Sequence, residues 1–465
     1  MIRVGLPFLP KVRLVALDDL WVSDLDGLQI GQLAQGDSCR VLPGQDARFI
    51  QVGPSPDPPG RELVAGIEPF TRRIYLRDGP GYKEPGLPTH EPGLPTHDRV
   101  AGGPCTPVMK RSLGSGLHHL YLGGGVVILE MGKWRLELGG LRFHGPVAIK
   151  GLPVGRGFPW EFEEDARFAG EVEIIPWKDG TVRPVNIVSL EDYIASVVAS
   201  EIGPGAPPEA QKAQAVAARS TLFSTYGSHH LLGPFGICSE DHCQVYRGTG
   251  VETPDSRKAA LETQGLVLLY NGDVVDARFS KCCGGITEEF SGAWEDRDVP
   301  YLLSRPDGDY DLSLENEEKV RDFIEYPPPA FCSESKNFRW EVRYDAAALS
   351  GIIRANSGQD LGPIFEIIPL ARGKSGRITS LRITGKRGEL VLSPELEIRR
   401  VLSDTYLNSS CFYVLKEGDD FIIRGAGWGH GVGMCQEGAI GMATKGVGFM
   451  EILSFYYRGS ELRES

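Results

Sequence analysis

The chain has 465 residues and a formal net charge of −13 at pH 7, with 41% hydrophobic and 24% charged residues. This length exceeds what one hydrophobic core usually serves, so we expect two or three domains, and the composition excludes global disorder. Because binding to a phosphate backbone needs clustered Lys and Arg, the acidic balance argues against a nucleic-acid partner. The net negative charge of the chain suits a neutral or cationic substrate better.

The sequence gives little sign of a membrane span or a secretion signal. No stretch approaches the roughly 20 apolar residues that a bilayer span requires. The opening residues 1–7 also lack the basic-then-apolar pattern of a secretion signal. A removed leader and a cytosolic location both stay open at this point.

Residues 1–165 are predicted to form a β-rich module. Apolar runs at 13–17, 40–42 and 73–76 are separated by Gly, Asp and Pro turns, and further runs follow between 118 and 165. Within this module the segment Glu-Pro-Gly-Leu-Pro-Thr-His occurs twice in succession, over residues 84–97. The duplication is too short and too proline-rich for a structural repeat, so we expect an exposed loop. Metal binding by its two histidines is the alternative.

A helix is predicted over residues 189–204. Ser189 is a suitable N-cap, and Gly203-Pro204 is a stop signal. At about 100° per residue, Glu201 falls near the middle of an apolar stripe formed by Leu190, Tyr193, Ile194, Val197 and Val198. Burial there would raise the pKa of Glu201, as a general acid requires. The alternative is a structural Glu201 that reaches solvent or pairs with Arg219.

The next predicted helix starts at Pro207-Pro208 and stops at Gly227, with a face that is almost entirely alanine. Small residues let two helices approach closely. We therefore expect this helix to pack against the one that carries Glu201, which would bring Gln214 and Arg219 near that residue. Otherwise both are ordinary surface residues.

Cysteine and histidine residues concentrate between positions 229 and 243. The nine cysteines of the chain are odd in number and scattered, so they do not form a disulfide framework. Cys238, His242 and Cys243, with His230 or His229 as a fourth ligand, match the Cys₂His₂ preference of structural zinc. The alternative is a local disulfide between Cys238 and Cys243 in an oxidising compartment.

A second cysteine pair follows a predicted hairpin. Asn271-Gly272 between two apolar runs predicts a type I′ turn, and Cys282-Cys283 comes soon after, next to Gly284-Gly285. Cys283 could be a nucleophile, but the small residues around it favour a packed or metal-adjacent thiol.

A glycine occupies every second position from 425 to 433. The segment has no Gly-Lys-Ser/Thr, which argues against a phosphate loop. Glycines at this density let the backbone approach a ligand closely, with Trp428 and His430 facing it. A saccharide would suit such a site. The alternative is a tight strand-to-helix turn that contains a satisfied histidine.

Five segments in order resemble the SpoIID/LytB family of sporulation and cell-wall proteins. They are residues 190–201, 210–219, 244–248 (Gln-Val-Tyr-Arg-Gly), 372–377 and 427–436. The resemblance covers about residues 170–460. It implies that Glu201 is a catalytic acid and that a zinc ion can precede Gln244. The chain departs from the family at Lys281, Cys282 and Cys283, where relatives have a Ser-rich segment, which puts any serine role in doubt.

The resemblance implies a peptidoglycan lytic transglycosylase that cleaves peptide-stripped glycan strands to 1,6-anhydro ends. The substrate-side candidates are Gln214, Arg219, Tyr246, Trp428, His430 and Gln436. The alternatives are a non-catalytic wall-binding enhancer of an amidase, or a zinc or cysteine hydrolase using the 238–243 cluster or Cys283 with His430. A cell-wall amidase is then a possible partner, and a location in the cell envelope or periplasm follows.

The expected fold class is α+β, with a few helices packed on a largely antiparallel sheet in an exported, multi-domain monomer. The module of residues 1–165 precedes a catalytic region over 166–310. Residues 311–465 complete the core and contain the glycine-rich His loop.

Overall fold

The computed structural model describes residues 1–25, 27, 29–43, 49–52, 63–68, 73–78, 118–121, 127–131, 134–138, 140–156, 158, 161–177, 181–230, 234–294, 297–312, 314 and 316–464. The duplicated segment 84–97, predicted to be an exposed loop, lies outside these residues. The chain forms two compact units. The first unit comprises residues 1–154, 162–190 and 227–250, and the second comprises 155–161, 191–226 and 251–465.

The first unit is built from strands. They are β1 (Ile2–Gly5), β2 (Val12–Ala16), β3 (Leu20–Ser23), β4 (Gln29–Leu33), β5 (Ser38–Pro43), β6 (Phe49–Val52), β7 (Leu63–Glu68), β8 (Arg73–Asp78), β9 (His118–Tyr121), β10 (Val127–Met131), β11 (Trp134–Leu138), β12 (Leu141–His144), β13 (Val147–Val154), β14 (Phe162–Phe168), β15 (Glu171–Pro176), β16 (Val182–Val188) and β17 (Ile237–Cys238). The β-rich character predicted for this part of the chain is confirmed.

Three sheets arrange these strands. Their orders are β17-β1-β16-β15-β12-β3-β4, β11-β10-β5-β2-β13-β14 and β6-β7-β8-β9. Within these three sheets, the pairing among the described strands is antiparallel except for β1 with β17. Strand β16 is buried at all seven positions because it lies between β1 and β15, so its side chains pack on both faces of the sheet. This unit continues to residue 190 and includes residues 227–250.

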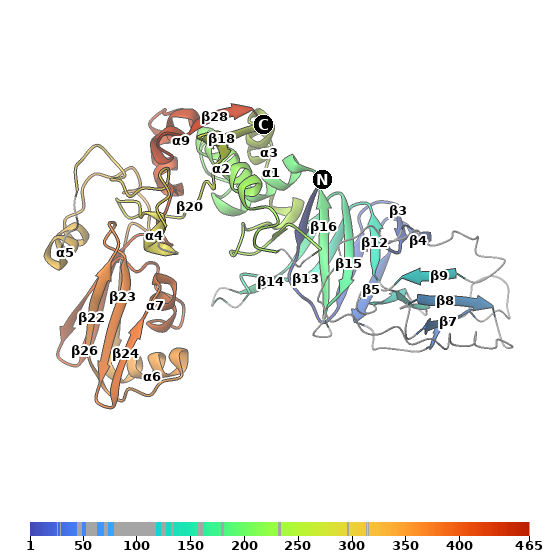
Figure 1. Ribbon diagram of the computed structural model, residues 1–465, viewed down its shortest axis with the longest axis horizontal. Coiled ribbons are helices and arrows are strands. Elements are labelled where there is room, and N and C mark those ends of the chain that lie inside the picture. Colours follow the sequence, from blue (N-terminus) through green and yellow to red (C-terminus); the bar gives the residue numbers. More distant parts are fainter. Residues whose placement is uncertain are drawn as a thin grey trace, which may run out of the picture. The chain divides into compact units, whose positions relative to one another are not determined.

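The second unit contains most of the helices. They are α1 (Leu190–Glu201), which belongs to this unit from Glu191 onward, α2 (Pro208–Thr225), α3 (Pro254–Glu262), α4 (Phe290–Ala293), α5 (Glu317–Glu325), α6 (Ala346–Ser357), α7 (Glu395–Val401), α8 (Gln436–Thr444) and α9 (Phe449–Tyr456). A 3₁₀ helix, η1 (Gly248–Val251), joins the two units in sequence. Figure 1 shows α1, α2 and α3 grouped near the C-terminus.

Short sheets complete the second unit. The strands are β18 (Leu266–Tyr270), β19 (Asp273–Val274), β20 (Phe279–Ser280), β21 (Arg339–Asp345), β22 (Ile364–Arg372), β23 (Ile378–Gly385), β24 (Gly388–Leu392), β25 (Phe412–Glu417), β26 (Asp420–Ala426), β27 (Met434–Cys435) and β28 (Glu461–Glu464). Sheets β22-β23-β24 and β21-β26-β25 share a hydrophobic core with α6 and α7 (Figure 1). The predicted α+β class is confirmed.

The predicted hairpin is one of the elements that the structure reproduces. Strands β18 and β19 pair across Asn271 and Gly272, which adopt φ values of 52° and 90°. Positive φ at both central residues is the requirement of a type I′ turn.

Across the described residues, we find no helix with the length and apolar character needed to cross a bilayer.

The glycine-rich segment lies beside the chain that follows this hairpin. Strand β20 pairs in parallel with β27, and Cys282 forms an antiparallel bridge with Trp428. Glu288 then forms a parallel bridge with Val432. Two segments about 150 residues apart in sequence are thus joined along their length, and this pairing fixes the glycine-rich loop.

Candidate functional site

Helix α1 places Glu201 at the margin of the core. Residues 193–199 of the helix are all buried, whereas Glu201, the last helical residue, is partly exposed. The helix ends there because Gly203 adopts φ of 96°, which glycine accommodates readily, and Pro204 follows. The predicted helix and its end are therefore confirmed, and its only carboxylate beyond the first turn lies where the apolar face meets the surface.

The alanine-rich helix α2 is closely packed. Its alanines at 210, 213, 215, 217 and 218 are buried, as close packing requires. Helices α3, α8 and α9 and strand β18 are among its neighbours. An ion pair between Arg219 on α2 and Glu191 on α1 also joins α2 to the helix that carries Glu201. Packing of the alanine face against that helix stays a prediction.

Arg219 connects α2 to the start of α1. Its observed ion pair is with Glu191 and not with Glu201. Its guanidinium is fully buried, and Nη2 lies 2.6 Å from a carboxylate oxygen of Glu191. The same group donates hydrogen bonds to the backbone oxygens of Leu266 and Ala260. These bonds satisfy a buried charge, so Arg219 acts as a structural ion pair in this unit.

Gln214 and Gln436 are brought together from two distant motifs. Gln436 is the first residue of α8, and its Nε2 donates a hydrogen bond of 3.2 Å to Oε1 of Gln214 on α2. Both side chains are buried. The contact therefore fixes the start of α8 against α2, directly after the glycine-rich loop.

The glycine-rich loop depends on left-handed backbone. Gly427, Gly429, Gly431 and Gly433 have φ between 74° and 91°. A Cβ atom on Gly431 would lie 2.4 Å from the guanidinium carbon of Arg377, and one on Gly433 would lie 1.9 Å from a backbone oxygen. Both the conformation and the close approach therefore require glycine here.

The two predicted ligand-facing residues of this loop are both partly exposed. Trp428 exchanges backbone hydrogen bonds with Cys282, and the His430 ring lies 4.8 Å from that of Trp294. Trp294, an exposed aromatic residue, was missed by sequence reasoning. A lone tryptophan after a run of small and acidic residues was the signal that could have indicated it. The paired rings of His430 and Trp294 form an aromatic surface that suits a sugar face.

His430 is held as a neutral ring. Burial, followed by the charges of Arg278 and Arg377, lowers the pKa of His430 to about 3. Its Nδ1 accepts a hydrogen bond of 3.1 Å from the amide of Val432. The proton of the neutral ring is therefore on Nε2, which can donate a hydrogen bond.

A buried network beneath the loop explains the Arg372–Arg377 motif. Ser375 Oγ donates a hydrogen bond of 2.6 Å to the Glu288 carboxylate, and Arg377 Nη1 donates to Ser375 Oγ. Arg377 also donates through Nε to the backbone oxygen of Gly429. Burial raises the pKa of Glu288, against the effect of these donors. This network fixes the glycine-rich loop. Sequence reasoning missed Glu288, because nothing local distinguishes it from its neighbour Glu289.

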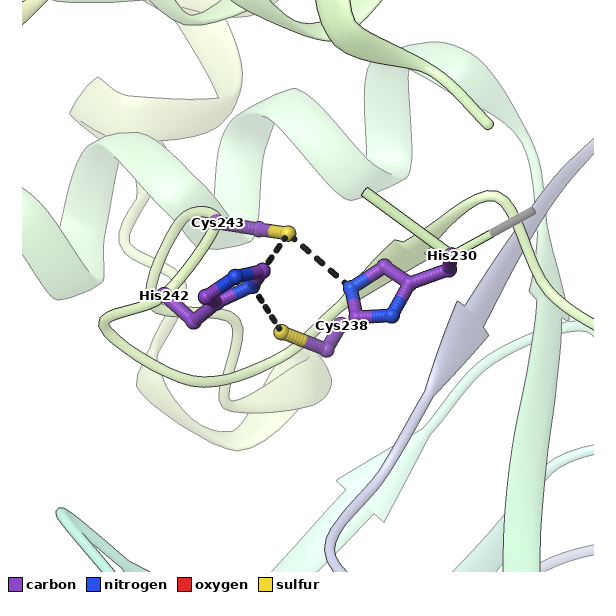
Figure 2. A group of neighbouring side chains, drawn as sticks. All are labelled: His230, Cys238, His242 and Cys243. Atoms are coloured by element: carbon purple, nitrogen blue, oxygen red, sulfur yellow. Dashed lines mark hydrogen bonds between the residues drawn. The ribbon is translucent and has the colours of Figure 1, made fainter. Parts of the chain in front are cut away.

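The predicted metal ligands converge in the first unit. Figure 2 shows His230, Cys238, His242 and Cys243 with their nitrogen and sulfur atoms directed toward one another. One ligand atom from each lies within 4.8 Å of all the others. His230 Nε2 is 3.2 Å from Cys243 Sγ, and His242 Nδ1 is 3.5 Å from the same sulfur. The arrangement can hold a metal ion, and His230 rather than His229 completes the set.

The cysteines of this cluster are not in a disulfide and are suited to metal ligation. Hydrogen bonding, first from Cys243, lowers the pKa of Cys238 to about 4, against the effect of burial. A thiolate is the form that binds metals. The alternative of a Cys238–Cys243 disulfide does not match the structure, in which both residues are free cysteines.

Tyr246 belongs to the same unit as this cluster. Its hydroxyl donates a hydrogen bond of 2.6 Å to Oδ1 of Asn186 on β16, and its side chain is buried. The Gln244–Gly248 motif therefore anchors the segment that follows the cluster to the sheet. Gly248 is required there because a Cβ atom would lie 2.1 Å from the backbone oxygen of Arg167.

Comparison with known proteins supports the order of motifs. A family model described as Stage II sporulation protein matches residues 178–270, and one described as Domain of unknown function (DUF8618) matches 288–433. An uncharacterized protein of Brachyspira hyodysenteriae is 32% identical over 300 residues, which cover 63% of this chain and 72% of that protein.

Two Bacillus subtilis proteins are also similar. The amidase enhancer is 28% identical over 295 residues, 58% of this chain and 40% of the enhancer. Stage II sporulation protein D is 28% identical over 295 residues, 60% of this chain and 76% of that protein. Together with the helical, Gln-Val-Tyr-Arg-Gly and glycine-rich motifs in one chain, these matches show that the protein belongs to the SpoIID/LytB family.

Proposed function

We propose that this chain is a peptidoglycan lytic transglycosylase in which Glu201 is both acid and base. The observation that carries the proposal is the position of Glu201, partly exposed at the end of a helix whose preceding residues are buried. A carboxyl group at such a boundary can be reached by a substrate, as a general acid must be. Membership of the SpoIID/LytB family adds support.

The proposed reaction needs one carboxyl group. Glu201 donates its proton to the glycosidic oxygen as the bond from that oxygen to C1 breaks. The resulting carboxylate accepts the proton of the sugar's own 6-hydroxyl, whose oxygen bonds to C1. The products are a 1,6-anhydro end and a free hydroxyl end. A second carboxylate to activate water is unnecessary because the nucleophile belongs to the substrate.

The exposure of the predicted binding residues narrows their proposed roles. Trp428 and His430 are partly exposed on the glycine-rich loop, so we assign them to direct sugar contacts together with Trp294. The remaining candidates are buried and support the scaffold; they are Gln214, Arg219, Tyr246 and Gln436.

Zinc is the proposed ion for the cluster of His230, Cys238, His242 and Cys243. Two sulfur and two nitrogen ligands are the preference of structural zinc, and four protein ligands leave no open position for catalysis. This favours a bracing role over a zinc hydrolase. A cysteine hydrolase is also disfavoured, because Cys283 is buried and out of reach of a substrate.

The proposed substrate is the peptide-stripped glycan strand. We propose that the protein is exported and acts on it as a monomer in the cell envelope or periplasm. Family membership and the aromatic surface beside His430 support this assignment. A cell-wall amidase is a proposed partner because one relative is named an amidase enhancer.

The test is incubation of the purified protein with peptide-free glycan strands, with products identified by mass spectrometry. We expect anhydro-ended fragments from the wild type and a loss of about 10²–10⁴-fold in rate for Glu201→Gln. Glu451→Gln, which changes an exposed glutamate on α9, is the matched control and should cleave normally. Equal rates for Glu201→Gln and the control would contradict the assignment.

The second proposed function is a non-catalytic enhancer that binds the wall and stimulates an amidase. The name of the Bacillus subtilis relative favours it. Intact strands from both the wild type and Glu201→Gln, with glycan binding retained and added amidase stimulated, would replace the first proposal by this one.

A further inference from the structure

A second group of ligand-type side chains lies in the core of the second unit. Cys283, Asp307, Cys332 and Cys435 come from four separate segments, and all four are buried. Three sulfur atoms and one carboxylate oxygen from them lie within 4.8 Å of one another. Nothing in the proposed glycan chemistry uses these residues.

The spacing of the sulfur atoms fits a single tetrahedral ion. Cys283 Sγ and Cys332 Sγ are 3.7 Å apart. Zinc–sulfur bonds of about 2.3 Å in a tetrahedron place two sulfurs about 3.8 Å apart, whereas a disulfide requires about 2.05 Å. The pair therefore has the separation of two ligands of one ion.

Backbone amides point at the sulfur atoms from the outside. Cys435 Sγ accepts hydrogen bonds of 3.2 Å from the amides of Cys283 and Gly438, and Cys283 Sγ accepts one of 3.4 Å from Gly285. Cys435 is also the N-cap of α8, where the helix dipole favours a thiolate. Outer-shell bonds of this kind orient metal ligands.

The carboxylate is held in the same way. Asp307 accepts hydrogen bonds from the Tyr456 hydroxyl at 2.6 Å and from the Cys332 amide at 3.0 Å. A Cβ atom on Gly438 would lie 2.1 Å from that hydroxyl and 2.6 Å from Asp307 Oδ1, so glycine at 438 makes room for the carboxylate.

The hydrogen-bond donors to these four side chains are backbone amides, the Tyr456 hydroxyl and neighbouring thiols. The charges of Arg305 and Arg339 also act on Asp307 and Cys332. Two single positive charges do not balance three thiolates and a carboxylate that are buried together. A bound dication would supply the remaining charge.

We propose that Cys283, Asp307, Cys332 and Cys435 bind a structural zinc ion. Thiolates with one carboxylate are suitable zinc ligands, and four protein ligands close the site. The ion would connect the Cys282–Gly285 turn to the end of the glycine-rich loop, since Cys435 follows Gly433 by two residues. This site is independent of the glycan chemistry proposed for Glu201.

The test measures zinc per chain by mass spectrometry of the metal, using the full chain in a Cys238→Ser/Cys243→Ser background that disables the first cluster. We expect one zinc to remain, and Cys283→Ser/Cys332→Ser to remove it. Cys411→Ser, which changes another buried thiol of this unit, is the control and should keep the ion. Absence of zinc from the background variant, or a Cys283–Cys332 disulfide in its intact mass under non-reducing conditions, would overturn the proposal.

Asp307→Asn keeps the shape of the side chain and remains informative if the cysteine variant does not fold. We expect it to weaken zinc binding by at least about tenfold in competition with a chelator. Cys282→Ser is the comparison, because its thiol contacts Cys332 and Cys435 but is not among the four proposed ligands. Unchanged affinity in Asp307→Asn, with loss of zinc in Cys282→Ser, would reject the ligand set.

Discussion

The two metal-ligand clusters of this protein differ in how the chain builds them. The first, His230, Cys238, His242 and Cys243, comes from one short segment and is partly exposed. The second, Cys283, Asp307, Cys332 and Cys435, spans more than 150 residues and is entirely buried. A local cluster can form with little of the fold in place. The buried cluster exists only when four distant segments have come together.

This difference has an energetic consequence. Where ligands are distant in sequence, metal binding and folding are coupled, because the unfolded chain has no preformed site. The free energy of binding then contributes directly to the stability of the second unit. The local cluster constrains a single loop and contributes less.

The largest expected difference is in stability. We expect Cys332→Ser in the buried cluster to lower the free energy of unfolding by about 3–5 kcal/mol, since it removes a metal ligand and leaves buried polar groups unmatched. Cys243→Ser in the partly exposed cluster should lower it by about 1–2 kcal/mol. Denaturant titration of zinc-loaded protein, followed by circular dichroism, measures both. A larger loss for Cys243→Ser would break the comparison.

Thiol reactivity should separate the clusters next. In metal-free protein at pH 6, we expect alkylation of the Cys238/Cys243 pair to be at least about 100-fold faster than that of Cys435 or Cys39. The thiols of Cys435 and Cys39 are buried, so they react only when the core opens. Hydrogen bonds, first from Cys243, lower the pKa of Cys238 to about 4, while burial raises those of Cys435 and Cys39 to about 11 and 12.

The sign of the pH effect follows from these values. A lowered pKa keeps the Cys238 thiolate above about pH 4, so labelling of the pair should fall only as pH drops through that value. Peptide mass spectrometry after timed alkylation identifies the sites. A rate of Cys238 labelling that instead rises between pH 8 and 9 would show that this thiol has an ordinary pKa.

The smallest expected effect concerns the loop that leads to the buried cluster. Because burial and nearby arginines lower the pKa of His430 to about 3, the unfolded chain binds a proton on this residue between pH 6.5 and 3 while the folded chain does not. Stability from this residue is therefore present above pH 6.5 and is lost on acidification. From pH 6.5 to 5 we expect a loss of about 1.5 kcal/mol.

His430→Gln isolates this contribution, since the amide oxygen can still accept the hydrogen bond from Val432. Its stability, measured by denaturant titration at each pH, should fall less than that of the wild type over the same range. Parallel pH profiles for the two proteins would contradict a neutral, partly buried His430.

Local signals located several elements correctly. Ser189 and Gly203-Pro204 delimited the helix that ends at Glu201, and Asn271-Gly272 located a turn with positive φ at both residues. An alanine-rich face on α2 indicated close packing, but the sequence did not identify α3, α8 and α9 as its neighbours. The Glu288–Ser375–Arg377 network was missed because its members lie about 90 residues apart.

The sequence by itself determined the family, the α+β class, the helix with Glu201 and the local cysteine and histidine cluster, because each depends on residues close together in the chain. Only the tertiary structure decided that Arg219 pairs with Glu191, that Gln214 meets Gln436, and that three further cysteines converge on Asp307. Such contacts depend on how distant segments pack, and packing is set by burial of the whole unit rather than by any local pattern.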